Sequence, residues 1–95
     1  MARLVHEVWI DAEGLPGCCL AGPMGDNARR LMAEGGPLTL AHRFAAGSHI
    51  EAMTIYHGLM GYEPYTTEFP VVDGQPYPDE WRDVQERAGI TVDGS

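Results

Sequence analysis

Two stretches with a two-residue period constrain the fold of this chain more than any other feature. In residues 3–11, RLVHEVWID, one face of an extended strand would carry Leu4, His6, Val8 and Ile10. Residues 37–45, PLTLAHRFA, repeat this pattern with Leu38, Leu40, His42 and Phe44. Residues 17–21, GCCLA, are short and apolar and follow the turn-forming sequence AEGLP. We expect three strands, of which the first two form an antiparallel hairpin.

Three other stretches carry helix signals. Residues 26–34 place one apolar set on a single helical face: Ala28, Leu31 and Met32. Ser48 and Glu51 have the spacing of a capping box, in which each side chain satisfies a backbone amide at a helix start. This spacing predicts a helix over residues 49–60. Residues 78–88 begin with proline and carry acids in the first turn, which predicts a helix at the end of the chain.

The order of these elements predicts an α+β fold for residues 1–95 as a single domain. We expect a small mixed sheet of three or four strands, with a ββαβα core packed against two helices. A proline-rich loop and the C-terminal helix would follow. A crossover through helix 26–34 would make strands 17–21 and 37–45 parallel. The sequence leaves open whether these two strands are neighbours, and whether His6, His42 and His49 meet in space.

Composition narrows the possible functions. The net charge is −8, and residues 51–95 carry nine acids against two arginines. Nucleic-acid binding draws its affinity from Lys and Arg on phosphates, so we expect no nucleic-acid partner. The absence of lysine excludes Schiff-base chemistry and a Walker-type phosphate loop. No apolar run reaches membrane-spanning length and no secretory signal is evident, so we expect a cytoplasmic protein with no membrane partner.

Histidine and cysteine patterns suggest no metal, cofactor or catalytic site. His49 and His57 are eight residues apart on the predicted helix, roughly 12 Å along its axis, so they cannot share one ion. Methionines beside His57 suit a soft metal, but at helical spacing they more often fill a core. Cys18 and Cys19 are adjacent in a predicted strand, where their side chains point to opposite faces. We leave enzyme activity open and favour none.

One candidate ligand site follows from the expected parallel strands. The loops AGPMGDN and AAGSH would lie side by side, and each leads into a helix N-terminus that offers backbone amides to an anion. The candidate ligand residues are Cys19, Gly22, Gly25, Gly47, Ser48 and His49. The competing interpretation is that the glycines are turn residues and that Ser48 is only a helix cap. A small-molecule or anion-binding protein with its site at these loops, and with enzyme activity left open, is therefore the alternative hypothesis.

The leading hypothesis is a non-enzymatic module that binds another protein, including a second copy of itself as a homodimer. Its basis is a set of aromatic residues in the proline-rich part of the chain: Tyr62, Tyr65, Phe69, Tyr77 and Trp81. Tyr and Trp are enriched at protein interfaces. The competing interpretation is that these rings only pack the loop onto the sheet. The sequence does not identify the partner, the ligand or the biological process.

Overall fold

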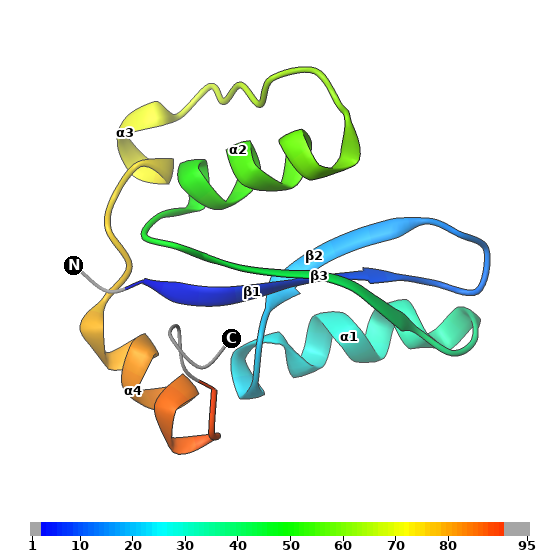
Figure 1. Cartoon of the computed structure of the whole chain (residues 1–95). Helices are drawn as coiled ribbons and strands as arrows, with labels where there is room; N and C mark the ends of the chain where they lie inside the picture. Colours follow the sequence, from blue (N-terminus) through cyan, green and yellow to red (C-terminus); the bar gives the residue numbers. More distant parts are fainter. Residues whose placement is uncertain (1–2, 91–95) are drawn as a thin grey trace.

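The computed structural model describes residues 3–90 and has an α+β fold, which confirms the expected class (Figure 1). The strands are β1 (Leu4–Ile10), β2 (Pro16–Leu20) and β3 (Thr39–Ala46). The α-helices of the described residues are α1 (Asp26–Met32), α2 (His49–Met60), α3 (Pro70–Asp73) and α4 (Asp79–Arg87). Short 3-10 turns, Pro23–Gly25 and Ala33–Gly35, flank α1. No helix among the described residues is long and apolar enough to cross a membrane.

The sheet has the strand order β2-β1-β3, and both neighbouring pairs are antiparallel. The expected mixed sheet is therefore wrong, because β2 and β3 run in the same direction but β1 lies between them. The physical reason is the burial of β1. Leu4, Val5 and Val8 are fully buried, so this strand is covered on both faces and is paired along both edges.

The two faces of the sheet are covered by different helices. Figure 1 shows α2 on one side of the sheet and α1 on the other, with α4 beside the N-terminal end of β1. His6 is paired with Leu20 and Phe44 on neighbouring strands, and these side chains share the face toward α2. Glu7 and Cys19 share the face toward α1, where both contact Arg29.

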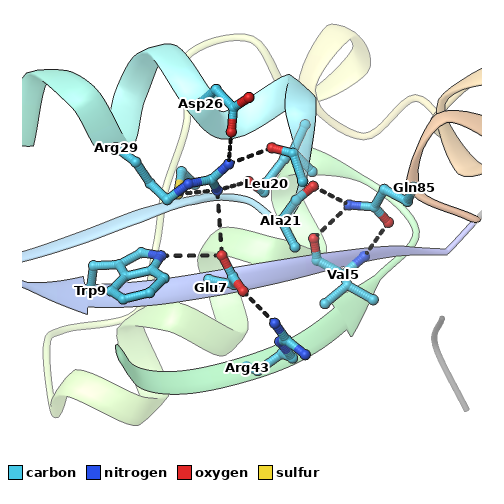
Figure 2. Close-up of polar contacts among 11 residues, drawn as sticks. Val5, Glu7, Trp9, Leu20, Ala21, Asp26, Arg29, Arg43 and Gln85 are labelled. Atoms are coloured by element: carbon cyan, nitrogen blue, oxygen red, sulfur yellow. Dashed lines mark hydrogen bonds and ion pairs between the residues drawn. The ribbon is translucent and has the colours of Figure 1, made fainter. Parts of the chain in front are cut away.

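Helix α1 contacts the sheet through a charged residue and through only one member of its predicted apolar stripe. Ala28 and Leu31 are exposed, whereas Met32 is half-buried and its side chain lies against Gly17 of β2. Arg29 extends across the sheet to donate hydrogen bonds to Glu7, the Leu20 carbonyl and the Gly22 carbonyl (Figure 2). The helix ends after seven residues, too short for a continuous stripe to determine how it packs.

Helix α4 is anchored by a buried glutamine. The Gln85 side chain accepts a hydrogen bond from the Val5 N–H at 2.9 Å and donates to the carbonyls of Val5 and Ala21 at 2.9 and 3.0 Å. These contacts continue the hydrogen bonding of β1 beyond the end of β2 (Figure 2). Most amphipathic helices pack on a sheet through apolar residues. In α4 the buried contact with the sheet is instead made by the hydrogen-bonded Gln85 side chain.

Helix α2 begins with the capping box that the sequence predicts. The Ser48 side chain accepts a hydrogen bond from the Glu51 N–H, and Glu51 in turn accepts one from the Gly47 N–H, both at 3.2 Å. The helix ends at Gly61, whose φ of 73° is in the left-handed region that favours glycine. The chain then continues through the proline-rich segment, which contains the short helix α3 and returns to pair Ser48 with Pro76 in an isolated bridge.

Candidate functional site

A cavity lies between the α2 face of the sheet and the segment that leads into α4. This inner cavity has a volume of about 360 Å³. Its lining includes the side-chain set His6, Cys18, Leu20, Met53, Tyr77 and Trp81. An outer cavity of about 290 Å³ adjoins it and shares His49, Tyr77 and Trp81. The inner volume is within the range of small-molecule sites, and its lining is mainly apolar with a few polar groups, as such sites usually are.

A histidine–tyrosine pair forms part of the inner cavity wall. The buried His6 ring has Nδ1 3.0 Å from the Leu4 carbonyl oxygen and Nε2 3.0 Å from the Tyr77 hydroxyl. A carbonyl only accepts, so Nδ1 carries the proton and Nε2 of the neutral ring accepts from Tyr77. Phe44 stacks on the other side of His6, with ring centroids 5.2 Å apart. The pair is thus fixed in position and in tautomer.

The ionisable groups of this wall are held in their uncharged forms. Burial lowers the pKa of His6 below its usual value, an effect larger than the opposing hydrogen bond to Leu4. Burial raises the pKa of Tyr77 to about 12, and burial followed by the proximity of Cys19 raises the pKa of Cys18 to about 12. At neutral pH the wall therefore presents an imidazole, a phenol and a thiol without charge. Neither a thiolate nucleophile nor a phenolate base is available there.

The adjacent cysteines point into different environments. Cys18 is opposite Val8 on the α2 face, whereas Cys19 is opposite Glu7 on the α1 face. The Cys19 sulfur accepts a contact from Arg29 at 3.7 Å. Burial raises the pKa of Cys19, and this effect exceeds the lowering by Arg29. Both cysteines are free. Because their side chains lie on opposite faces of the sheet, they do not form a dithiol site.

The structure does not bring the six predicted ligand residues together. Gly22 and Gly25 lie near α1, where a side chain on Gly25 would come within 1.8 Å of the Leu20 carbonyl oxygen. Gly47 and Ser48 begin α2 on the other face, and the Gly47 carbonyl accepts from the Tyr77 N–H at 3.0 Å. The two loops leave the same end of the sheet but turn to opposite faces. Of the predicted set, His49 and Cys19 border the inner cavity, but the Cys19 side chain is on the other face of the sheet, against Arg29.

Four of the five predicted interface residues form two groups, and Phe69 belongs to neither. Tyr62 and Tyr65 pack edge-on against His57 of α2, and Tyr65 also contacts His49. Tyr77 lies beside Trp81 and is bonded to His6, so these two rings belong to the cavity wall. Phe69 precedes α3 and has 65% of its surface exposed. Part of the set thus packs against the fold, and part remains on the surface.

Only a weak signal in the sequence pointed to the inner cavity. His6 stands on the apolar face of a strand, but its partner Tyr77 is 71 residues away in the chain. Of the three histidines whose meeting was left open, His6 and His49 both line the inner cavity, and His42 is opposite Val8 outside it. Among residues 3–90, no three His, Cys, Asp or Glu side chains gather closely enough to hold a metal ion.

No protein-family model, curated protein or solved structure matches this chain. We therefore infer the function from the chemistry of the inner cavity and from the surfaces beside it.

Proposed function

We propose that this protein binds a neutral, mainly apolar small molecule in the inner cavity and does not transform it chemically. The observation that carries the proposal is the cavity wall formed by His6, Cys18 and Tyr77, where burial favours the uncharged form of each group. A charged ligand would lose its hydration without gaining an opposite charge from these groups. A neutral ligand loses little hydration free energy on entering the cavity, and it covers the apolar parts of the wall. This is the small-molecule alternative of the sequence analysis, at a different place in the fold.

The hydrogen-bonding pattern of Tyr77 favours one feature of the ligand. Its hydroxyl donates to His6 Nε2, so its oxygen retains lone pairs that can accept a hydrogen bond. A ligand with one hydroxyl or N–H donor can bond to this oxygen without displacing His6. The flat surfaces of Tyr77 and Trp81 suit an aromatic body. A planar aromatic alcohol or amine therefore has the best match.

The first experiment compares 2-naphthol with naphthalene-2-carboxylate by titration and by thermal unfolding of the untagged protein. We expect 2-naphthol to bind with a Kd at least tenfold lower and to raise the melting temperature, because only the carboxylate is charged. Met53→Trp should abolish 2-naphthol binding by filling the inner cavity, whereas Leu59→Trp, on an exposed part of the same helix, should not. Cys18→Met is the second cavity-filling variant if Met53→Trp does not fold. Equal binding to the folded cavity-filling variant and to Leu59→Trp contradicts the proposal.

A second candidate function, protein binding, is supported by the exposed apolar residues of α3. Val71 is 79% exposed and lies between Phe69 and Val72, which are also exposed. Val72 and Trp81 line the outer cavity beside them. Residues 62–81 contain five acids and no lysine or arginine. Two copies meeting here would bring like charges together, so this acidic apolar surface favours a basic protein segment with an apolar anchor.

This second candidate is tested with a synthetic peptide of alternating Lys and Leu. We expect the peptide to bind the protein at low ionic strength and to lose affinity in high salt. Phe69→Asp should weaken binding at least tenfold, whereas Leu15→Asp, in the exposed hairpin turn, should leave it within twofold. Retained peptide binding by a folded Phe69→Asp variant excludes this surface as the site.

A further inference from the structure

The outer edge of β3 is an eight-residue strand edge without a strand partner among the described residues. Thr39, Ala41 and Arg43 are exposed, and the Leu40 side chain is 43% exposed. An open strand edge offers backbone N–H and C=O groups to another chain. One of these groups, the Ala45 carbonyl, is already bonded to the Arg3 side chain, which a pairing strand would have to displace. The opposite edge of the sheet differs, because β2 has only five residues and begins with Pro16 and Gly17.

The backbone groups that face outward can be assigned from the rest of the sheet. The Val5 N–H and C=O are bonded on the β2 side, to Gln85 and Ala21. Since these groups alternate in direction along a strand, those of His6 face β3. His6 is paired with Phe44, so the backbone of Phe44 faces β1 and that of Arg43 and Ala45 faces outward. The Ala45 carbonyl accepts from the exposed Arg3 side chain at 3.0 Å.

The charges around β3 indicate what can approach it. The chain carries 14 acids against 6 arginines, yet residues 37–48 contain none of these acids. The charge of Arg43 is partly neutralised by Glu7, 2.6 Å away. A second copy can therefore reach this edge without the acid–acid repulsion that it meets at residues 62–81. The strand lacks proline and lysine, which often protect an exposed edge. Its pairing with β1 skips Ala41, so the regular part of the edge is residues 42–46.

We propose that β3 pairs antiparallel with β3 of a second copy, across a twofold axis, to form a continuous six-stranded sheet. An antiparallel strand pair is self-complementary and closes as a dimer. The register centred on Arg43 is disfavoured, because it would place this positive charge opposite itself. This dimer needs neither the inner cavity nor α3, so its test is independent of the ligand-binding experiment.

The test is sedimentation equilibrium of the untagged full chain, combined with amide hydrogen exchange at low and high protein concentration. We expect a concentration-dependent dimer, with exchange of the Arg43 and Ala45 amides slowing as it forms. The amides of His42 and Phe44 face β1 and should be protected in the monomer as well. A chain that remains monomeric at about 500 µM, a concentration high enough to populate a weak dimer, overturns the proposal.

Two edge variants separate β3 pairing from association elsewhere. Ala45→Pro removes an outward N–H, and Ala41→Lys places a charge on the exposed strand, so each should weaken dimerisation at least tenfold. The second variant keeps the proposal testable if the first does not fold. Thr54→Lys, on the exposed side of α2, is the matched control and should still dimerise. Unchanged dimerisation in the folded edge variants overturns the proposal.

Discussion

At the scale of single residues, the described fold depends on polar side chains that are buried with their partners. Glu7 is buried and receives hydrogen bonds from Trp9, Arg29 and Arg43. Gln85 satisfies three backbone groups at the end of the sheet. No buried side-chain polar atom of the described residues lacks a partner. Removing one member of such a group leaves the others unsatisfied, which costs more than the bond itself contributes.

Gln85→Leu is therefore expected to destabilise the protein although it adds apolar surface. The Val5 N–H loses its acceptor, and a buried unsatisfied group costs about 1–3 kcal/mol of the free energy of unfolding. Gln75→Leu is the matched control, because the side chain of this second glutamine is exposed. Urea unfolding measures both. Equal stability of the two variants would show that the buried amide does not anchor α4.

His6 predicts a dependence of stability on pH. Burial lowers its pKa in the folded state below the value of about 6.5 in the unfolded chain. Between these two values the unfolded chain binds more protons, so the free energy of unfolding rises with pH, by at most about 1.4 kcal/mol per pH unit. The His6 contribution is complete above about pH 6.5 and is lost as the pH falls toward the folded pKa.

His6→Gln isolates this contribution, because glutamine does not titrate but can still accept from Tyr77. We expect the difference in unfolding free energy between the wild-type protein and this variant to change between pH 5 and 7, roughly the window set by the histidine pKa. Urea titrations at several pH values measure it. A difference that stays constant with pH contradicts the buried neutral imidazole.

The ends of a helix depend on nearby residues in the sequence, whereas its packing depends on residues of other elements. The caps of α2 are within a few residues of the helix, at Ser48, Glu51 and Gly61. Its ends could therefore be predicted from the sequence. The packing of α1 could not, because Arg29 is held by Glu7 and Leu20, which belong to other elements. A helix of seven residues gives too little periodicity to identify the side that faces the sheet.

Arg29→Met is expected to lower the free energy of unfolding by about 2–4 kcal/mol, because it leaves the buried Glu7 carboxylate with fewer donors. Arg30→Met is the matched control on the same helix. Arg30 is exposed and bonded only weakly to Asn27, at 3.4 Å, so its loss should cost about 0.5 kcal/mol or less. Hydrogen exchange of the α1 amides should rise in the first variant alone. Similar losses in both variants would mean that α1 is held mainly by other contacts.

At the scale of the whole molecule, apolar burial is concentrated on the central strand. Among the described residues the fully or nearly buried apolar set is small: Leu4, Val5, Val8, Cys19, Ala21, Ala46 and Ala52. Three of these residues belong to β1, and three others are alanines. A core of this size supports a small stability margin. Substitutions in β1 should therefore have the largest effects.

Leu4→Ala is expected to cost about 2–5 kcal/mol, a large share of the 5–15 kcal/mol or so that is typical of a domain. Leu15→Ala removes the same atoms from an exposed turn and should cost about 0.5 kcal/mol or less. Urea unfolding of both variants measures the contrast. If both variants lose the same free energy of unfolding, the burial of Leu4 in β1 does not contribute the expected stability.

Local patterns in the sequence were enough to predict the α+β class, the three strands and the helices α1, α2 and α4, but not the short helix α3. The two-residue period indicated β1 and β3, and the capping residues indicated the start of α2, because these signals arise from neighbours in the chain. The sequence also indicated that Cys18 and Cys19 face opposite sides, since side chains alternate along any strand.

The strand order, the helix that covers each face of the sheet and the position of the candidate site became evident only in the folded structure. It placed β1 between β2 and β3, which separated the two glycine loops. It also brought His6 to Tyr77 across 71 residues and Val5 to Gln85 across 80. Such contacts depend on where whole elements pack, and local periodicity contains no information about that choice. The inner cavity could therefore be found only after the chain was folded.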